Sequence, residues 1–361
     1  MIKNLTTLLV GFILLFLSSC KEDIEEVIIQ DSTPYILLYG GLPDPTLPDD
    51  NVLTVQGVKL GKMLFYETLL SKGESQSCAS CHLQKDGFSD LSQFSEGVEG
   101  LLGKRQAMPI FNMAWHSNEF FWDGRANLLR DQALLPIQDP LEMNETLENV
   151  VDKLSSEKMY RDQFTRVYGN EEITPDKIAL ALEQFMLSIV SYQSKYDQYL
   201  AGNVDLTESE ARGETLFFTE FNPFFPEFSG ADCAHCHGGL NFENDLYMNN
   251  GLDEEANILD IGRMKVTELS EDKGKFKVPS LRNIELTGPY MHDGRFTTLE
   301  EVVEHYNSGL HPSSTLDLAL ESTRETGLGL SEEDKTDLVN FLKTLTDYAY
   351  IENEEYADPI R

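Results

Sequence analysis

Four of the five cysteines lie in two copies of one motif, at residues 78–82 (Cys-Ala-Ser-Cys-His) and 233–237 (Cys-Ala-His-Cys-His). Two thiols three positions apart can add to the two vinyl groups of one haem, and the histidine that follows can bind the iron as its proximal ligand. The alternatives are a Cys₄ zinc site, which requires no histidine after each pair, and a thioredoxin-like redox pair, which is expected in a βαβ context. The motifs therefore predict two covalently bound haem c groups, held by Cys78, Cys81, His82, Cys233, Cys236 and His237.

The fifth cysteine, Cys20, follows an N-terminal segment that is typical of exported proteins. Lys3 precedes the apolar run 8–17, which is too short for the roughly 20 residues that cross a bilayer. Leu-Ser-Ser-Cys at 17–20 resembles the lipobox of bacterial lipoproteins, and the alternative is an ordinary secretory signal. We expect a signal peptide at 1–19, a lipid on Cys20 as the only membrane contact, and an exported chain on the periplasmic side of a bacterial membrane, with the cell surface as the alternative.

The charge balance excludes one class of function and predicts a property of the partner. The chain has 28 Lys and Arg against 62 Asp and Glu, a net charge of −34, which argues against nucleic acid held by phosphate contacts. Four cysteines used for haem and one for lipid leave none for a disulfide. We expect a protein partner with a basic patch, whose association rate falls as salt rises.

A weak internal repeat organises the 361 residues into two similar units. Gly-Lys-Met-Leu-Phe-Tyr at 61–66 and Gly-Glu-Thr-Leu-Phe-Phe at 213–218 each precede a cysteine motif, and an Asp-Gly-Arg follows each motif. Each copy ends in an amphipathic segment, opened by Thr174 in the first and Ser331 in the second. Few stretches alternate apolar and polar residues, so the sequence predicts an all-α fold with little β structure.

The repeat also sets the expected boundaries of the two domains. Residues 20–50 are expected to form a tether and extended lead-in, because residues 41–50 carry three prolines among aspartates. The first domain is expected at 51–203 and the second at 204–346. Residues 347–361 are acidic and poor in core residues, which predicts a loosely held tail.

From about Leu42 to Thr346 the chain resembles the bacterial dihaem cytochrome c peroxidase family, including its MauG-like branch. The resemblance is carried in order by residues 121–126 (Phe-Trp-Asp-Gly-Arg-Ala), 140–143 (Pro-Leu-Glu-Met), 281–283 (Leu-Arg-Asn) and 289–295 (Pro-Tyr-Met-His-Asp-Gly-Arg). It implies two cytochrome c-like domains, a peroxide-reacting haem in the first, an electron-accepting haem in the second, and a calcium ion between them. A homodimer is common in the family.

Three catalytic residues are implied by the same resemblance. Trp122 matches the tryptophan that lies between the haems, where its ring can carry an electron, although a plain core tryptophan is the alternative. Glu142 and Gln132 match the pair over the open face of the first haem. Glu142 can take a proton from one oxygen of hydrogen peroxide and return it to the other, so that water leaves, while Gln132 orients the peroxide or a water.

The resemblance also bears on which faces of the haem irons are open. No histidine lies between His82 and His116, where the peroxidase branch has one that caps the first haem, and we expect His116 to be partly exposed and unligated. The first haem is therefore expected to be open, as in the MauG-like branch. Tyr306 holds the position of the second haem's sixth ligand, where a phenolate would lower the potential relative to methionine. Its rivals are Met291, Met248 and His305.

The resemblance places the calcium ion on the carbonyls of Thr287 and Pro289. The asparagine that the family adds is not cleanly matched, because Arg-Gln-Ala-Met-Pro stands at 105–109.

Three functions remain open at this point. The first is a dihaem peroxidase that reduces hydrogen peroxide with electrons from a c-type cytochrome or cupredoxin, passed from the C-terminal to the N-terminal haem. The second is a MauG-like, peroxide-dependent oxidase of a protein side chain or a small molecule. The third is an electron-transfer cytochrome, although a carrier needs no acid-base group over an open iron.

Overall fold

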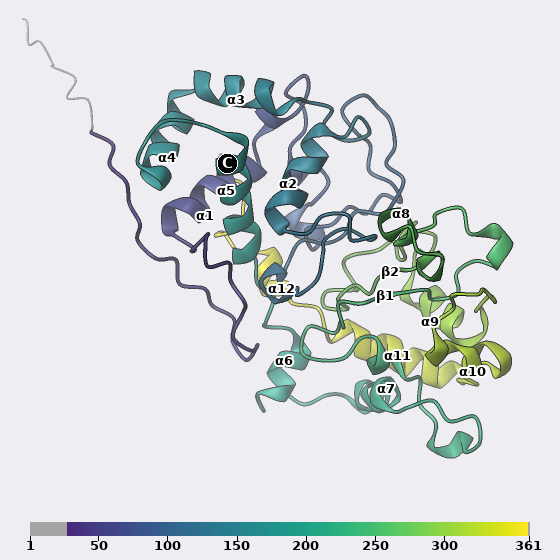
Figure 1. The fold of residues 1–361 in the computed structure, drawn as a ribbon. Helices are drawn as coiled ribbons and strands as arrows, with labels where there is room; N and C mark the ends of the chain where they lie inside the picture. The colour runs from purple at the N-terminus through teal and green to yellow at the C-terminus, as the bar shows by residue number, and fades with distance from the viewer. Residues whose placement is uncertain (1–26, 360–361) are drawn as a thin grey trace, which may run out of the picture.

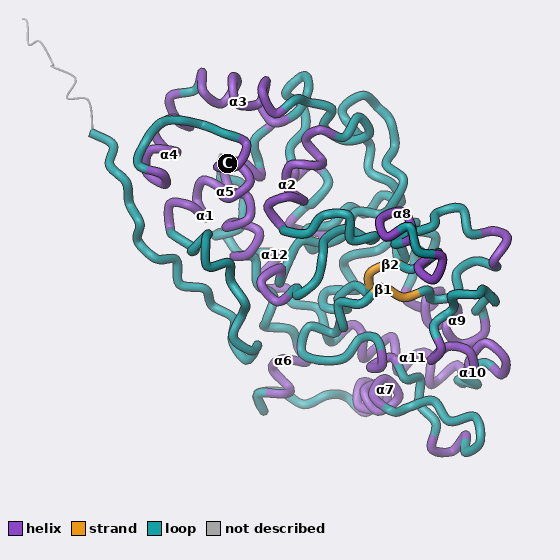
Figure 2. The backbone as a smooth tube through the Cα atoms, viewed as in Figure 1, coloured by secondary structure: helices purple, strands orange, loops and turns teal. Residues whose placement is uncertain are grey.

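The computed structural model describes residues 27–359, so the signal segment and Cys20 lie outside the described residues. Figure 1 shows two lobes that follow each other along the chain, one around α1 to α5 and the other around α6 to α11. Helices and loops make up nearly all of this part, with one short pair of strands (Figure 2). This agrees with the predicted all-α class. None of the helices within 27–359 is long and apolar enough to cross a membrane.

The elements follow one another in the order that the repeat predicts, with a long helix before each cysteine motif. The strands β1 (Tyr247–Met248) and β2 (Phe276–Lys277) pair antiparallel. The helices are α1 (Val55–Phe65), α2 (Leu129–Gln138), α3 (Leu147–Ser156), α4 (Lys158–Tyr168), α5 (Pro175–Ser188), α6 (Lys195–Leu200), α7 (Glu208–Phe218), α8 (Met264–Thr267), α9 (Leu299–Ser308), α10 (Leu318–Thr326), α11 (Glu332–Lys343) and α12 (Tyr348–Ile351).

Side-chain caps start the helices that close each lobe, as the sequence predicts. The Thr174 hydroxyl accepts a hydrogen bond from the third amide of α5, whose first residue is proline. Ser331 and Asp334 form a capping box at the start of α11, and Thr207 and Glu210 form another at the start of α7. Each cap satisfies amide groups that the helix itself leaves unpaired.

Each lobe is built on one pair of helices that touch at a glycine. In the first lobe Gly61 of α1 lies against the carbonyl of Ala181 in α5. In the second, Gly213 of α7 lies against the carbonyl of Asp337 in α11. A Cβ at either glycine would clash with that backbone, so both copies of the repeat need glycine for the same close approach.

Buried apolar side chains form two separate clusters, one in each lobe. The first cluster lies around α1, α2 and α5, and the second around α7, α9 and α11. Aromatic rings pack against one another in the second cluster. The ring centroid of Phe341 lies 5.1 Å from that of Phe217 and 5.2 Å from that of Tyr196. Each cluster lies against one cysteine motif, so each motif rests on its own core.

Buried hydrogen bonds join the two lobes where the chain passes between them. The Asp347 carboxylate accepts hydrogen bonds from the Ser191 hydroxyl (3.2 Å) and from the amides of Tyr192 and Gln193 (both 2.9 Å). The amide of Asp347 in turn donates to the Asn283 side chain (2.8 Å). Because buried polar groups are costly unless paired, this network fixes how the lobes meet.

The C-terminal segment differs from the loose tail that its acidic composition predicts. After Asp347 the chain returns to the first lobe, where Tyr350 and Tyr356 are 2% and 6% exposed within its apolar cluster. The Tyr350 ring lies 5.8 Å from that of Phe111, and the Tyr356 ring 6.3 Å from that of Phe88. The two tyrosines therefore belong to the first core.

Replacing Tyr356 with alanine should lower the free energy of unfolding by about 3 to 5 kcal/mol, the usual cost of removing a large buried aromatic side chain. Tyr348→Ala is the matched control, because Tyr348 is 56% exposed and should change stability by about 0.5 kcal/mol or less. Urea unfolding followed by circular dichroism measures both. Equal stabilities of the two variants would contradict the packing of the C-terminal segment.

Candidate functional site

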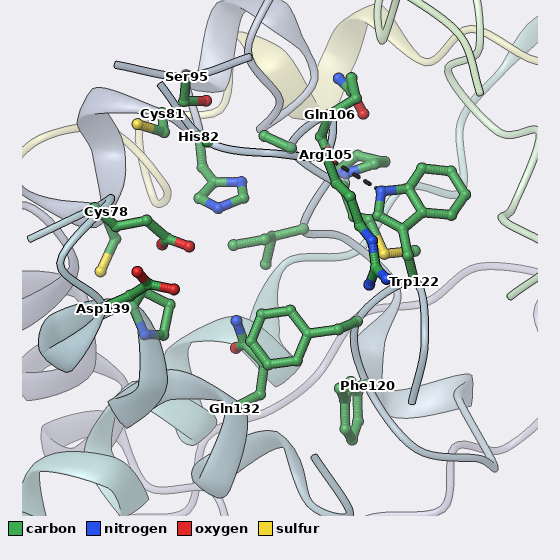
Figure 3. Close-up of a pocket in the computed structure, with 18 of the residues that line it drawn as sticks. Cys78, Cys81, His82, Ser95, Arg105, Gln106, Phe120, Trp122, Gln132 and Asp139 are labelled. Carbon is green, nitrogen blue, oxygen red and sulfur yellow. Dashed lines mark hydrogen bonds between the residues drawn. The ribbon is translucent and has the colours of Figure 1, made fainter. Parts of the chain in front are cut away.

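A cavity of about 760 Å³ lies beside the first cysteine motif, mostly within the first lobe. Cys78, Cys81 and His82 line one side of it, and Figure 3 shows the His82 ring pointing into the space. Gln132 and Phe120 lie on the opposite side in this view. The volume falls in the range of cofactor pockets, about 300 to 1,000 Å³. The cavity can therefore hold a large planar group beside the two thiols.

Both motif histidines are oriented as iron ligands need to be. Nδ1 of His82 lies 3.0 Å from the carbonyl of Phe88, and Nδ1 of His237 lies 3.2 Å and 3.1 Å from the carbonyls of Phe242 and Pro279. A carbonyl at Nδ1 fixes the ring and leaves Nε2 available for a metal. Burial lowers the pKa of His82, and it lowers the pKa of His237 to about 4, which keeps both rings neutral. These residues fit a haem at each motif.

Glu142 lies in the same cavity with a pKa suited to proton transfer near neutral pH. Burial raises the pKa of its carboxyl to about 7, the nearby charge of Asp139 adds to the rise, and Arg125 opposes it. The loop around Glu142 is held by its neighbours, since the amide of Val98 donates to the Glu142 carbonyl (2.8 Å). Gln132, on α2, lines the same cavity. The structure thus brings Glu142, Gln132 and His82 around one space.

Trp122 lies at the boundary between the lobes. Its indole N–H donates to the carbonyl of Gln106 (2.9 Å; dashed in Figure 3), and the amide of Gln106 donates to the carbonyl of His292 in the second lobe (2.9 Å). The carbonyl of Trp122 accepts from the amide of Lys277, also in the second lobe (2.7 Å). The ring is 9% exposed and lines the cavity. Trp122 is therefore bonded to the second lobe through its backbone carbonyl and, by way of Gln106, through its side chain.

A set of ion pairs holds the turn that carries Trp122. The neighbouring Asp123 is 1% exposed and pairs with Arg105 at 2.7 Å and Arg125 at 3.1 Å. Arg105 also makes two hydrogen bonds to Asp260 of the second lobe (2.7 and 2.8 Å). Arg263, from the same lobe, donates to the carbonyl of Asp123 (3.1 Å). Burial raises the pKa of Asp123, but the two arginines hold it below its ordinary value, so the carboxylate stays charged.

In the second lobe, both candidate sixth ligands face one asparagine. The Asn250 amide lies 3.3 Å from the Tyr306 hydroxyl and 3.3 Å from the Met291 sulfur. Tyr306 is partly buried close to the second cysteine pair, and desolvation of its hydroxyl raises its pKa to about 12. Met248 also approaches this motif, with its sulfur 3.3 Å from Cys236. His305 also contacts this asparagine, with its Nε2 3.0 Å from the Asn250 carbonyl.

Aligning the two copies by their Asp-Gly-Arg turns identifies one further residue that the sequence reasoning missed, Pro136. Helices α2 and α9 each begin four residues after the turn's arginine, and Pro136 in α2 holds the place of Tyr306 in α9. Pro136 lines the first cavity and has no side-chain donor for iron. This comparison was available in the sequence, and it shows that the first cavity has no counterpart of the Tyr306 hydroxyl at this position.

The turn itself is strained at the same point in both copies. Phe121 and Met291 have φ angles of 69° and 74°, which large side chains rarely adopt. The Arg125 guanidinium lies over the Phe121 ring, 3.5 Å from its centroid. Such strain is characteristic of functional sites, and here the turns place a phenyl ring beside the first cavity and a thioether next to Asn250.

His116 is intermediate in exposure, in line with the expectation of a partly exposed histidine, and its side chain contacts charged partners from the second lobe. Its side chain is 9% exposed, with Nδ1 2.9 Å from Asp245 and 3.6 Å from Glu243, both in the second lobe. Lys277 also pairs with Asp245, at 2.9 Å. Burial lowers the pKa of His116, but the two carboxylates outweigh it and raise the pKa above its ordinary value. The groups form an ionic cluster across the boundary, where His116 is engaged by carboxylates.

Thr287 and Pro289 lie in the loop before the second Asp-Gly-Arg, close to the first lobe. Thr287 is 6% exposed, and its methyl group approaches Gly87 of the first lobe. The predicted calcium carbonyls are therefore at the boundary between the lobes. No asparagine has been assigned as a third ligand, so calcium binding stays a prediction.

Comparisons with known proteins identify relatives of this chain. The family model for di-haem cytochrome c peroxidase matches residues 55–205. The methylamine utilization protein MauG of Methylorubrum extorquens is 34% identical over 82% of this chain and 80% of its own. The cytochrome c551 peroxidase of Nitrosomonas europaea is 36% identical over 80% of this chain and 79% of its own.

A solved MauG-like protein associated with microbial copper homeostasis has the same fold. Its TM-score is 0.81 at 32% identity, and the match covers 90% of this chain and 99% of that one. Sequence, fold and the two histidine sites thus point to the same group of proteins. The chain belongs to the di-haem cytochrome c peroxidase and MauG family, whose cofactors are c-type haems, and it is an oxidoreductase of the peroxidase type.

Proposed function

We propose that the protein reduces hydrogen peroxide to water with electrons from a small redox protein, passed from the C-terminal haem to the open N-terminal haem. A bound haem supplies the iron redox chemistry that breaks the oxygen–oxygen bond. The observation that carries the proposal is Glu142, whose carboxyl faces the cavity of His82 with a pKa of about 7.

The role of Glu142 is to move one proton within the substrate. As a carboxylate it takes the proton from the near oxygen of hydrogen peroxide, and as an acid it returns that proton to the far oxygen, which leaves as water. A pKa near the working pH makes both transfers efficient. Gln132, across the cavity from His82, can hold the peroxide by a hydrogen bond from its amide.

Trp122 is the proposed electron relay between the two haems. Its ring is fixed by one hydrogen bond to Gln106, and its backbone is bonded to the second lobe through Lys277. The indole keeps its proton, because the carbonyl it donates to is a poor base. The proposed sixth ligand of the second haem is Tyr306, with Met291 as the alternative. Both lie within 3.3 Å of Asn250.

A second candidate is a MauG-like oxidase that uses peroxide to oxidise a protein side chain or a small molecule. Two observations favour it. No histidine stands between His82 and His116 to cap the first haem, and Tyr306 rather than methionine faces the second motif from α9. Steady-state peroxide turnover, measured with and without a reduced cytochrome or cupredoxin, separates the two candidates. If peroxide is not consumed in either case, the remaining function is that of an electron-transfer cytochrome.

The cellular setting is part of the proposal. We place the protein outside the cytoplasm, held to a bacterial membrane by a lipid on Cys20. Thr287 and Pro289 are proposed to bind a calcium ion between the lobes, and a homodimer is the proposed assembly.

The Glu142→Gln variant should react with hydrogen peroxide about 10² to 10⁴ times more slowly than the native protein. The native rate should rise with pH through about 7, because only the carboxylate form of Glu142 accepts the proton, and the variant should lose this rise. Stopped-flow mixing with peroxide at several pH values measures both. The exposed carboxyl of Glu148 in α3 provides the control, Glu148→Gln. Equal rates in all three proteins would remove Glu142 from the mechanism.

Replacing Tyr306 with methionine should raise the reduction potential of the second haem, because a thioether stabilises reduced iron more than a phenolate does. Met291→Leu is the matched variant on the other side of Asn250 and should leave the potential unchanged. A potentiometric titration followed by optical absorption measures the reduction potential of the second haem in both variants. A shift in Met291→Leu alone would assign the ligand to Met291.

A further inference from the structure

Three exposed phenylalanines lie in the loop that leads into the second cysteine motif. Phe224, Phe225 and Phe228 are 84%, 57% and 73% exposed, and the loop runs from the end of α7 to Cys233. In Figure 1 it projects from the lower edge of the second lobe, on the side away from α1 and α5. Clustered large apolar side chains on a surface are typical of binding sites. The proposed chemistry uses none of the three.

Hydrogen bonds hold this loop in one shape. The amide of Gly230 donates to the carbonyl of Glu220 (3.0 Å) and closes the base of the loop. At its tip the side-chain oxygen of Asn222 accepts from the amides of Phe224 (3.1 Å) and Phe225 (3.2 Å). The rings are therefore presented on a fixed backbone, and a partner that covers them does not first have to order the loop.

The first copy of the repeat shows that the fold does not need this exposure. A short 3₁₀ turn stands between the long helix and the cysteine motif in both copies, at Thr68–Leu70 and at Pro226–Phe228. Leu70 is 0% exposed and packs in the first core, whereas Phe228 is 73% exposed. At the same place in the architecture, one copy turns its apolar side chain inward and the other turns it outward.

The charge around the phenylalanines has one sign. Residues 213–262 contain no lysine or arginine, and Glu220 and Glu227 are exposed within the loop. Anionic lipid headgroups would be repelled by this surface, whereas a protein with lysines around an apolar patch would match it. The overall charge of −34 adds long-range attraction for such a protein.

We propose that loop 219–232 is the docking surface for the electron-carrier protein, and that the carrier meets it with an apolar patch ringed by lysines. The inference rests on the proposed function, because it says where the donor of that function binds. The phenyl rings fill the apolar centre, and Glu220 and Glu227 pair with the lysines. Each encounter moves one electron, which oxidises the carrier and reduces the haem attached at Cys233, the residue that follows the loop.

The test replaces all three rings at once, in Phe224→Ser/Phe225→Ser/Phe228→Ser holoprotein. With a reduced, lysine-rich c-type cytochrome as the probe, kcat/KM for the carrier should fall about tenfold or more, the weight of an interface hot spot. The reaction of the pre-reduced variant with hydrogen peroxide should keep its native rate, because the first cavity is untouched. An unchanged kcat/KM would overturn the proposal.

The matched control removes equally exposed apolar side chains elsewhere. Ile36 and Leu38, in the lead-in along the first lobe, are 79% and 66% exposed, and Ile36→Ser/Leu38→Ser should leave kcat/KM unchanged. Glu220→Gln/Glu227→Gln should weaken the salt dependence of association, which the triple phenylalanine variant should retain. Equal losses in the control and the triple variant would also contradict a specific docking surface.

Direct binding separates a failure of this inference from a failure of the proposed function. Calorimetric titration of the oxidised carrier into native and triple-variant protein measures docking without turnover. Binding lost in the triple variant supports the surface even where peroxide is not consumed. The same titration with vesicles of neutral lipid, on full-length Cys20→Ser protein, tests the membrane instead. Vesicle binding that the three serines abolish would replace the carrier with a lipid surface.

Discussion

The arrangement of this molecule depends on a single buried carboxylate, that of Asp123. At 1% exposure it can stay charged only because Arg105 and Arg125 pair with it, since an unpaired charge in such a place is very costly. Arg105 also forms an ion pair with Asp260, so the ionic network extends into the second lobe. Trp122 is the residue directly before Asp123 in the chain. The ion pairs that satisfy Asp123 therefore fix the tryptophan ring at the boundary between the two cysteine motifs.

The two lobes use one framework for two different tasks. Both have a glycine contact between long helices, a strained Asp-Gly-Arg turn and a helix of equal length after it. The differences are confined to the side chains that this framework presents. Pro136 stands beside the first cavity where Tyr306 stands beside the second motif, and Phe121 stands where Met291 does. A repeated fold thus gives one site a carboxyl group and room for substrate, and gives the other two candidate ligands.

The sequence predicts what local signals encode, and it misses what distant contacts decide. The cysteine motifs and the caps at Thr174 and Ser331 are patterns of a few residues, and the structure has the helices where those caps predict them. The prediction of a loose C-terminal tail was wrong. The acidic composition of this segment does not show that Tyr350 and Tyr356 pack in the first core.

The candidate site shows the same division. Glu142 was placed by family resemblance, but its suitability for proton transfer comes from burial, which only the fold reveals. The sequence did not show that His116 pairs with Glu243 and Asp245, because these carboxylates stand more than 120 residues away along the chain.

The central claim is that one haem has an open face and the other does not. Electron paramagnetic resonance of the ferric protein as isolated tests it most directly. The account predicts one high-spin, five-coordinate haem at His82 and one low-spin, six-coordinate haem at His237. Two low-spin signals would contradict the open site, and with it the assignment of Glu142 and Gln132 to peroxide chemistry.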